Sequence, residues 1–556
     1  MNFLQFRRKV TSLGFCLITL GTTTYSVAQT PDNRPVLRVA VQQILTSGAM
    51  DPLREQSNVG TRILPMIYAP LIELDTVGDL APRAALAESW KRIDDHTIEF
   101  KIRQGVKFHD GQEMTAEDIA FSFGPERMFG DSKPRKRDQD SKTIAVDIGM
   151  KTTTAAPGNM NTPPPEVVAI ARNLWPSLES VKIIDKYTVQ LVNAVPDVTL
   201  EGRVARLGSE IISKKAYLSA KDWNSWAQNP VSAGPFKVKE VKQDQYVILT
   251  ANDDYFGGKP NVKEIRYIVV PEVSSRINGL ISGQYDFITD IPPDQFKTIE
   301  NNPQLDIVGG PVLNHRLIAF DKNQEILKNP KMRQAMSHAI DRDAIIESIW
   351  AGKTTVPKGL QWEYFGNMFI EDWEVPKYDV ALAKKLIKET GYKGEPIPFR
   401  TLNNYYTNQV QTDQILLEMW RAVGLNVQLQ MKENWGQIFE QGPDRGVRNW
   451  SNSAPFSDPV SSLVNQHGPN GQQQQTGEWT NAEFNKLSDI LETSTDMQER
   501  RRTFARMLEI AEREDPAYTV LHRSAVFYAK RKDFNWKASQ TFVMDFRAEN
   551  LSIAKK

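Results

Sequence analysis

The six histidines are the side chains of this sequence best suited to metal or acid–base chemistry. His109 stands next to Asp110, a pair that would suit a metal-dependent phosphohydrolase. The other histidines do not have the spacing of metal ligands: His96, His315, His338, His467 and His522. We therefore interpret His109 as part of a strand-exit turn and His338 as a packed core histidine, and we expect no metal site.

Sequence signatures of catalysis are absent as well. The chain contains no G-x-S-x-G, no G-x-x-x-x-G-K-[ST] and no H-E-x-x-H. Because no constellation for catalysis exists, we predict a protein that is not an enzyme and that needs no cofactor. A secreted hydrolase is the alternative from a different functional class.

Aromatic and polar residues in irregular segments offer binding chemistry instead. Enclosing a solute removes it from water, so a pocket needs flat apolar surfaces and a few polar groups that compensate desolvation. Four groups of residues supply candidate ligand-binding side chains: Trp362, Tyr405, Tyr406, Trp435, Trp450, Asn452 and Ser453. Packing within the domain explains any one of these aromatic residues equally well, but their grouping after predicted strand ends favours ligand contact.

Periodicity and capping residues mark the elements that would position these side chains. Polar and apolar residues alternate over Thr97–Arg103, which predicts a half-buried strand, and Val36–Val41 is typical of a buried one. Thr115, with Asp118 three residues later, predicts the start of a helix. Leu425–Met431 alternates again and is expected to be a strand.

Further helices are expected in the second half of the chain. Asn329 before Pro330 predicts one helix start, and Asp379 predicts another whose helix ends at Gly391. Nearer the N-terminus we expect a helix over 62–74. We interpret the glutamine run at 472–475 as an exposed loop. Helix, glycine and strand recur in the manner of α/β units.

Two long stretches resemble one known family in the order of their residues. The first holds A-P-R-A-A-L-A-E-S-W, F-K-I-R-Q-G-V-K-F-H-D-G and T-A-E-D between residues 81 and 118. The second holds L-I-A-F-D-K-N and P-K-M-R-Q-A-M-S-H-A-I-D-R-D-A-I-I between residues 317 and 346. These motifs resemble the extracellular solute-binding proteins of peptide-type ABC importers, which include oligopeptide-, dipeptide- and nickel-binding proteins.

The resemblance implies an α/β fold, namely the two-lobed periplasmic binding protein fold with mixed sheets, in its large form with an extra subdomain. We expect residues 29–65, 190–310 and 520–556 to form lobe I, and residues 311–519 to form lobe II. Residues 66–189 should form an accessory subdomain of lobe I, with an insertion at about 130–165. The two crossings between the lobes are placed near Gly310–His315 and Glu514–Leu521.

The N-terminus has the pattern of a secretory signal peptide. The basic residues 7–9, the apolar core 13–20 and the small residues 26–28 predict a signal peptide over residues 1–28. The apolar core is shorter than the roughly 20 residues of a membrane-spanning helix. Cys16 follows a phenylalanine, which argues against a lipoprotein. We therefore expect a periplasmic protein whose mature form lacks cysteine.

The charge balance gives no sign of a polyanionic partner. Basic and acidic residues are equal in number over the whole chain, 68 of each. The one basic run, at 133–137, is interleaved with aspartates and is typical of a solvated loop. We therefore expect no nucleic-acid partner.

By resemblance, the chain is the solute-binding component of an ABC import system. It would capture a peptide or peptide-sized polar solute between its lobes and deliver it, as a monomer, to inner-membrane permease subunits. The candidate aromatic residues fall in the second lobe, at positions where members of the family line the cavity.

One departure from the family concerns the ammonium group of a peptide. Peptide-binding members hold it with an acidic residue shortly before an acidic-Pro pair. Here the pair is present as Asp458-Pro459, but Ala454-Pro455 upstream offers no charge. A buried ammonium without a partner costs several kcal/mol. Asp458 is therefore a candidate replacement anchor, and opine-like amino-acid–sugar conjugates or oligosaccharides are the alternative ligands.

Overall fold

The computed structural model describes residues 32–129, 163–403 and 405–554. The predicted signal peptide, the basic run and most of the predicted insertion lie outside these residues. The chain divides into two compact units, residues 1–34 and residues 35–556, and every helix and strand described below belongs to the second.

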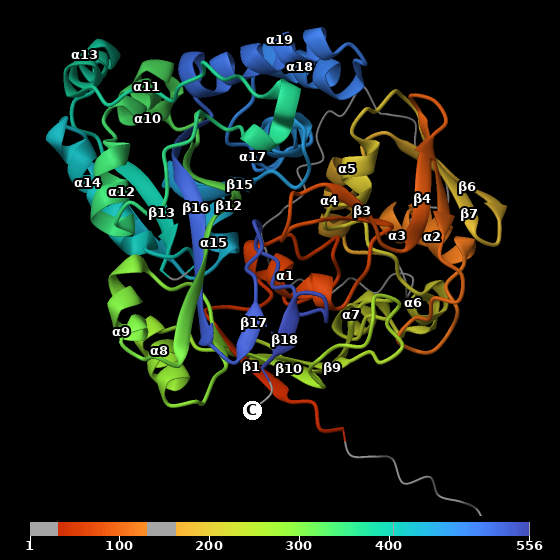
Figure 1. The fold of residues 1–556 in the computed structure, drawn as a ribbon. Coiled ribbons are helices and arrows are strands. Elements are labelled where there is room, and N and C mark those ends of the chain that lie inside the picture. The colour runs from red at the N-terminus through yellow and green to blue at the C-terminus, as the bar shows by residue number, and fades with distance from the viewer. Residues whose placement is uncertain (1–31, 130–162, 404, 555–556) are drawn as a thin grey trace, which may run out of the picture. The chain divides into compact units, whose positions relative to one another are not determined.

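A ten-stranded mixed sheet runs through the second unit (Figure 1). In spatial order its strands are β14 (Val427–Lys432), β13 (Ile397–Leu402), β15 (Val447–Ser453), β12 (Leu305–Phe320), β16 (Tyr518–Arg531), β11 (Phe287–Ile288), β1 (Val36–Val41), β10 (Glu264–Val269), β9 (Tyr246–Ala251) and β8 (Phe236–Lys242). β13 is parallel to β14 and β15, and β1 is parallel to β10 and β11. The other pairs are antiparallel. The expected α/β class with a mixed sheet is confirmed, as is the strand at β1.

Two long strands, β12 and β16, join the two halves of this sheet. We use lobe I for β1 and β8–β11 with the elements packed on them, and lobe II for β13–β15 with theirs. β12 and β16 pair antiparallel with an irregularity between Pro311 and His315. Gly309 precedes it with a φ of 112°, and a Cβ there would lie 2.1 Å from the Val526 carbonyl oxygen. Pro311 and His315 face Ala525 and Arg523 across this irregularity, and the predicted crossing at Glu514–Leu521 stays a prediction.

Lobe I carries an accessory four-stranded antiparallel sheet of order β4 (Ala87–Arg92), β5 (Thr97–Ile102), β7 (Thr188–Asn193) and β6 (Leu178–Asp185). The strand predicted from alternation is confirmed as β5, whose Ile98, Phe100 and Ile102 are buried. Helix α2 (Ala116–Ser122) follows Thr115, whose backbone N–H donates to the Asp118 carboxylate at 3.0 Å. The predicted capping box is therefore present.

The other elements of this half are short. They are α1 (Asn58–Ile63), η1 (Leu64–Met66), β2 (Ile72–Leu74), β3 (Pro82–Ala84), α3 (Pro125–Phe129), α4 (Pro165–Leu174), α5 (Leu200–Val204), α6 (Lys214–Ser219), α7 (Trp223–Gln228), α8 (Val273–Ile281), η2 (Pro293–Gln295), α9 (Phe296–Glu300), β17 (Phe534–Trp536) and β18 (Leu551–Ile553). The helix predicted over 62–74 is wrong in its bounds. The Ser57 hydroxyl caps α1 by accepting the Gly60 N–H at 3.0 Å, and a 3-10 turn containing Pro65 ends it.

Lobe II is covered by α10 (Glu325–Lys328), α11 (Pro330–His338), α12 (Arg342–Trp350), η3 (Glu363–Met368), α13 (Val380–Thr390), α14 (Gln409–Ala422), α15 (Trp435–Phe439), η4 (Pro459–Ser461), α16 (Leu463–His467), α17 (Gln472–Gln475), α18 (Ala482–Thr493), α19 (Met497–Leu508) and the π-helical η5 (Glu509–Glu514). Two predicted helix starts are confirmed. The Asn329 side chain accepts the Lys331 N–H at 3.1 Å, and Asp379 accepts the Leu382 N–H at 2.8 Å. Gly391 ends α13 with a φ of 75°, as predicted.

The glutamine run at 472–475 is a helix and not an exposed loop, which corrects the prediction. Gln473 is fully buried. Its Nε2 donates to the carbonyl oxygens of Phe320 at 3.1 Å and Ala517 at 2.7 Å. These carbonyls lie at the end of β12 and just before β16, and the Ala517 carbonyl also accepts the Phe320 N–H at 3.0 Å, so the amide adds hydrogen bonds where the two strands meet.

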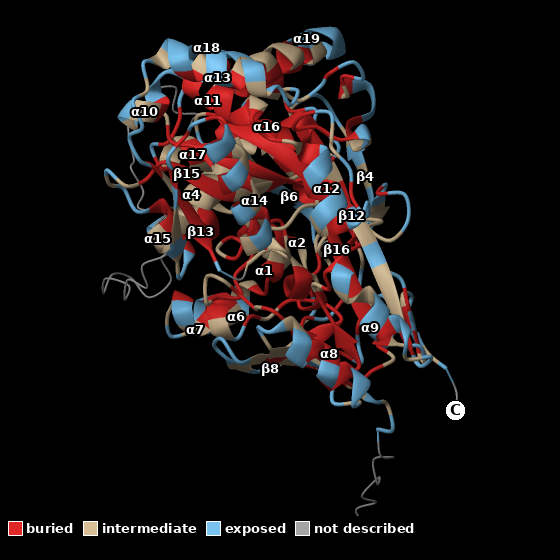
Figure 2. Cartoon of the chain, turned by 90° about the vertical axis from the view of Figure 1, so that its left-hand side faces the viewer, coloured by how far each residue is buried: buried red, intermediate tan, exposed pale blue. Residues whose placement is uncertain are grey.

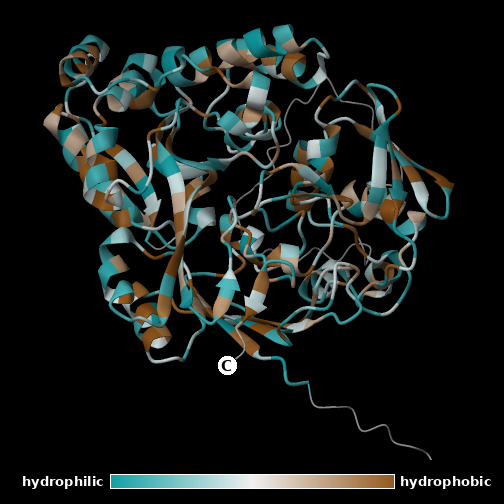
Figure 3. Ribbon diagram, in the orientation of Figure 1, coloured by the Kyte–Doolittle hydropathy of each residue, from teal (hydrophilic) through white to brown (hydrophobic). Residues whose placement is uncertain are grey.

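Burial changes along β12, which is partly exposed in its first half and buried from Val312 to Phe320 (Figure 2). The outer helices α18 and α19 bury one side, with Phe484, Leu491 and Phe504 in the core. Their remaining residues are largely hydrophilic (Figure 3). Lobe II therefore presents polar helices outward and keeps its apolar surface for the sheet.

Three histidines of lobe II and β16 are held neutral by burial. His315, His467 and His522 are each 1% exposed. Burial lowers the pKa of His315 and His467 to about 3 and the pKa of His522 to about 4. The pKa of a histidine in an unfolded chain is about 6.5. As the pH falls below about 6.5, the unfolded state binds protons that the folded state does not, so stability is lost toward about pH 4.

We therefore expect the free energy of unfolding to fall by about 1.4 kcal/mol per pH unit for each of these histidines. Burial raises the pKa of Asp413 to about 6 and that of Glu210 to about 7, which acts in the opposite sense, whereas His109, whose pKa burial lowers to about 4, acts with the three histidines. Urea unfolding between about pH 7 and about pH 5 measures the slope. His522→Gln should lower the slope of unfolding free energy against pH by about 1.4 kcal/mol per pH unit, which corresponds to one proton. An unchanged slope would contradict the assignment.

Candidate functional site

Five aromatic residues of lobe II pack against one another beside the ends of its parallel strands. We call Tyr405, Tyr406, Trp435, Phe439 and Trp450 the aromatic cluster. The tyrosines follow β13, Trp435 begins α15 after the end of β14, and Trp450 lies on β15. The Trp435 ring meets the rings of Tyr405 and Trp450 edge to face, each with centroids 4.9 Å apart. Four predicted site residues are thus brought together.

A hydroxyl at the centre of this region connects the lobes. Ser451 Oγ accepts hydrogen bonds from Asn58 Nδ2 at 3.3 Å, Asn314 Nδ2 at 3.2 Å and the Tyr406 hydroxyl at 3.2 Å. The Asn58 backbone N–H also donates to the Tyr405 hydroxyl at 3.2 Å. Asn58 begins α1 of lobe I, so lobe I meets the aromatic cluster directly, as the position of α1 in Figure 1 shows.

The two predicted polar residues on β15 lie at the same place. Ser453 Oγ accepts from Asn314 Nδ2 at 2.8 Å, and Asn452 Nδ2 donates to the Ser462 carbonyl at 3.2 Å. Asn314 belongs to β12, which pairs with β15 in register. The strand that joins the lobes therefore orients the polar edge of the site.

Two arginines pack against rings of the aromatic cluster. The Arg316 guanidinium lies 3.3 Å from the centroid of Tyr406 and donates to the Trp450 carbonyl at 2.9 Å. Burial lowers its pKa, and among the described residues it forms no ion pair. Arg448 lies 4.6 Å from the Trp450 ring and pairs with the buried Glu478 at 2.6 Å. The rings of Tyr406 and Trp450 therefore each contact a guanidinium cation.

Sequence reasoning missed Asn58, Asn314 and Arg316. Arg316 is a charged residue just before the apolar run 317–320 of a strand, which is a usable signal because arginine is rarely buried without a partner. Asn58 has no comparable signal, because its partners on Tyr405 and Ser451 are more than three hundred residues away.

Trp362 lies apart from the aromatic cluster. It is fully buried, stacks on His315 with centroids 4.1 Å apart and contacts Phe365 edge to face. The surrounding side chains form the core of lobe II under α19. Trp362 therefore packs in this core while its Nε1 has no hydrogen-bond partner within the described part of the chain, and its role as a ligand contact stays a prediction.

Asp458 is committed to a partner within lobe II. Its carboxylate accepts from Arg500 Nη2 at 2.9 Å and from the Val460 N–H at 3.0 Å. Arg500 is fully buried. The carboxylate is therefore neutralised by Arg500, and Asp458 does not offer a free charge to a ligand ammonium group.

A hollow of about 380 Å³ adjoins the aromatic cluster. It is lined by Gln43, Leu402, Asn403, Met431, Lys432 and Glu433. These residues follow or end β1, β13 and β14, and the carboxyl ends of parallel strands are where open α/β sheets bind ligands. The Oε1 atom of Gln43 is buried without a hydrogen-bond partner, so it is available to a donor on a ligand.

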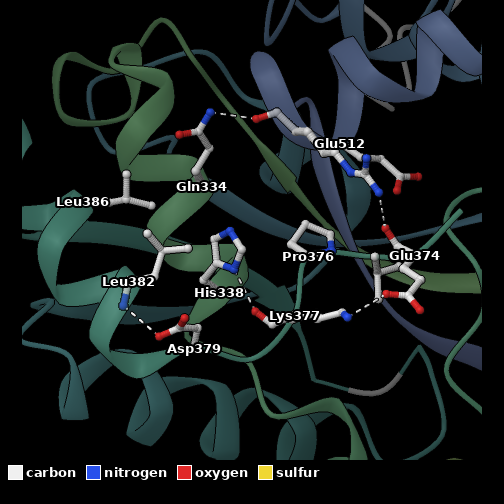
Figure 4. A pocket seen from close by; sticks show the side chains of 11 residues that line it. Gln334, His338, Glu374, Pro376, Lys377, Asp379, Leu382, Leu386 and Glu512 are labelled. Carbon is white, nitrogen blue, oxygen red and sulfur yellow. Dashed lines mark hydrogen bonds and ion pairs between the residues drawn. The ribbon is translucent and has the colours of Figure 1, made fainter.

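A larger hollow of about 500 Å³ lies on the outer face of lobe II between α11, α13 and η5 (Figure 4). Several of its polar groups are already paired with one another. His338 Nδ1 lies 2.7 Å from the Lys377 carbonyl, Lys377 pairs with Glu374 at 3.0 Å, and Gln334 Nε2 donates to the Arg513 carbonyl at 2.7 Å.

The structure also locates the histidine considered for metal chemistry. His109 Nε2 lies 3.1 Å from the Gly234 carbonyl, and its Nδ1 accepts the Ser232 N–H at 3.5 Å. Both contacts hold the turn after β5 against the segment before β8. Among residues 32–129, 163–403 and 405–554, no three metal-ligating side chains gather. In the same residues no helix has the length and apolar character to cross a membrane.

Two α/β lobes that share one sheet, are linked by two strands and meet over an aromatic cluster define a two-lobed binding protein. The solved structure of the periplasmic binding protein DppA from Helicobacter pylori with the peptide STSA has this fold. It superposes with a TM-score of 0.79 at 20% identity and covers 94% of this chain and 98% of that one.

The sequence comparisons give the family. The model of the bacterial extracellular solute-binding proteins, family 5, matches residues 81–474. The oligopeptide-binding protein AppA of Bacillus subtilis (strain 168) is 29% identical over 503 residues, covering 84% of this chain and 83% of AppA. The dipeptide-binding protein of Escherichia coli (strain K12) is 24% identical over 494 residues, covering 84% of this chain and 85% of that protein. The chain belongs to the bacterial extracellular solute-binding proteins, family 5.

Proposed function

We propose that this protein is the periplasmic solute-binding component of an ABC importer, that it captures a peptide or peptide-sized polar solute between its lobes, and that it catalyses no reaction. The contact of Asn58 in lobe I with the aromatic cluster of lobe II carries this proposal. The oligopeptide- and dipeptide-binding relatives support a peptide ligand.

The site has the composition that such capture needs. Tyr405, Tyr406, Trp435 and Trp450 offer flat apolar surfaces, and Asn452 and Ser453 offer donors and acceptors at the edge of β15. Backbone groups at strand ends supply further hydrogen bonds to an extended ligand. A solute held there is removed from water when the lobes close, and each apolar contact then contributes to affinity.

Closure about β12 and β16 is the motion that this proposal requires. The irregular pairing at Pro311–His315 and the glycines at 309 and 310 mark the place where the long strands can bend. Binding of a tryptic digest of casein should therefore reduce the radius of gyration and raise the melting temperature. Small-angle scattering and thermal unfolding, with and without the digest, measure both changes.

The alternatives appear as other outcomes of the same experiment. If the radius of gyration falls with an opine or a neutral oligosaccharide but not with peptides, the ligand of this protein belongs to that alternative class. Tight binding of a probe with an unchanged scattering profile would contradict the hinge.

A further inference from the structure

We propose that Arg206 is an anion anchor on lobe I, and that the solute captured by this protein carries a carboxylate which Arg206 binds. This inference rests on the proposed function and names the chemical class of its ligand. It assigns the polar recognition to a positive group on lobe I in place of a negative group on lobe II.

Arg206 follows α5, which lies against lobe II. Arg203 on that helix donates through Nη2 to Glu492 Oε1 at 3.4 Å. A Cβ on Gly202 would lie 2.7 Å from Phe456 of lobe II. Asn173 of α4, beside α5, donates to the Asn465 carbonyl at 3.1 Å. Arg206 therefore adjoins the seam along which the two lobes meet.

The guanidinium of Arg206 lacks the partners that a buried arginine needs. Nε and Nη1 are buried, and neither has a hydrogen-bond partner. Within the described parts of the chain, Arg206 forms no ion pair. The residue as a whole is nevertheless partly exposed. Buried donors without acceptors are unfavourable, and an anion that supplies acceptors removes this cost.

The acids near Arg206 are either paired with other groups or only partly ionised. Arg203 forms an ion pair with Asp197 at 2.8 Å, and Arg500 forms one with Asp458 at 2.9 Å. Glu210 accepts the Gly208 N–H at 2.8 Å, and burial raises its pKa to about 7, which leaves it only partly ionised at neutral pH. Burial, and then the Arg203 cation, lower the pKa of Arg206 to about 9. Glu210 acts in the opposite sense on Arg206 but is only partly ionised, so the charge of Arg206 is only partly compensated.

The acids nearer the aromatic cluster are also satisfied. Asp290 pairs with Arg62 at 3.0 Å. Glu55 accepts from the Ser47 hydroxyl and from the Ser47 N–H, both at 2.7 Å. Asp458 is likewise paired with Arg500, so these acids do not neutralise the Arg206 cation. A planar carboxylate matches the fork of an arginine through two parallel hydrogen bonds, so a carboxylate is the anion we assign.

The test compares probes that differ only in their carboxylates. A tryptic digest of casein and the same digest after methyl esterification are offered to the wild-type protein, Arg206→Gln, Arg206→Lys and the control Lys215→Gln. Lys215 is exposed on α6. The opine mannopinic acid and its dimethyl ester form a second pair of probes. Native mass spectrometry measures the bound fraction, and circular dichroism confirms that each variant is folded.

We expect the wild-type protein to bind free acids at least about tenfold better than esters, because the esters lose the charge-assisted hydrogen bonds. Arg206→Gln should reduce binding of the acids at least about tenfold and leave the esters unchanged. Arg206→Lys should fall between the two, and Lys215→Gln should match the wild type. Equal binding of acids and esters, or unchanged binding of acids by Arg206→Gln, would overturn the assignment.

The proposed function can fail separately. Binding of mannopinic acid that depends on Arg206, with no binding of peptides, would keep the anion anchor and refute a peptide ligand. If the folded wild-type protein binds no probe in either form, the anion anchor is refuted as well.

Discussion

Arg500→Met is expected to lower the free energy of unfolding by about 3–5 kcal/mol, because it leaves a carboxylate inside lobe II without its counter-charge. Arg500 is fully buried, and Asp458 holds it through both carboxylate oxygens. The Arg500 Nε also donates to the Leu491 carbonyl at 3.3 Å, which ties α19 to α18. Urea unfolding of the variant and the wild type measures the difference.

Arg502→Met is the matched control, because Arg502 lies on the same helix with its side chain exposed. It should change stability by less than about 0.5 kcal/mol. The double variant Asp458→Asn/Arg500→Met should recover part of the loss, since it removes the unpaired charge. A stability of Arg500→Met equal to that of the control would show that the ion pair contributes nothing, and Asp458 would again be open to a ligand.

Trp435→Ala and Trp450→Ala should each weaken ligand binding at least about tenfold. An indole buried against a ligand contributes on the order of 2 kcal/mol or more when truncated, and about 1.4 kcal/mol corresponds to one decade in affinity. Trp435 contacts four aromatic residues and Trp450 rests on Arg448, so both rings are fixed before the ligand arrives. Calorimetry with the casein peptide that the wild type retains best measures the effect.

Both tryptophans also pack within lobe II, so the binding experiment needs folded protein and a control. Each titration is made well below the melting temperature of its variant. Trp90→Ala removes a partly buried indole from β4 of the accessory sheet, and it should leave affinity unchanged. Unchanged affinity in both Trp435→Ala and Trp450→Ala would mean that these rings serve packing alone.

Local signals predicted local structure well. The capping pairs at Thr115, Asn329 and Asp379 and the alternating strand β5 are confirmed, because each depends on contacts within a few residues. The helix predicted over 62–74 has other bounds, because the Ser57 cap and Pro65 set its limits. Propensity also failed at Gln473, where tertiary hydrogen bonds bury a residue that the sequence marks as polar.

The site was predictable only in part, because sequence patterns report contacts within a few residues and not contacts between distant segments. Tyr405, Tyr406 and Trp435 follow strand ends, Trp450 lies on the neighbouring strand β15, and parallel strands bring such ends together. The partners that decide their roles come from far along the chain. Asn58 reaches Ser451 across the lobes, and Arg500 removes Asp458 from the ligand's reach, and neither contact has a signature in the sequence.

The central claim is that this protein holds a peptide or peptide-sized polar solute between its lobes. Native mass spectrometry of protein purified from a bacterial periplasm without added ligand tests it most directly. We predict a bound species whose fragmentation after release yields an amino-acid sequence ending in a free carboxylate. Protein that is recovered folded and without bound solute, and that still retains no peptide after incubation with a casein digest, would contradict the claim.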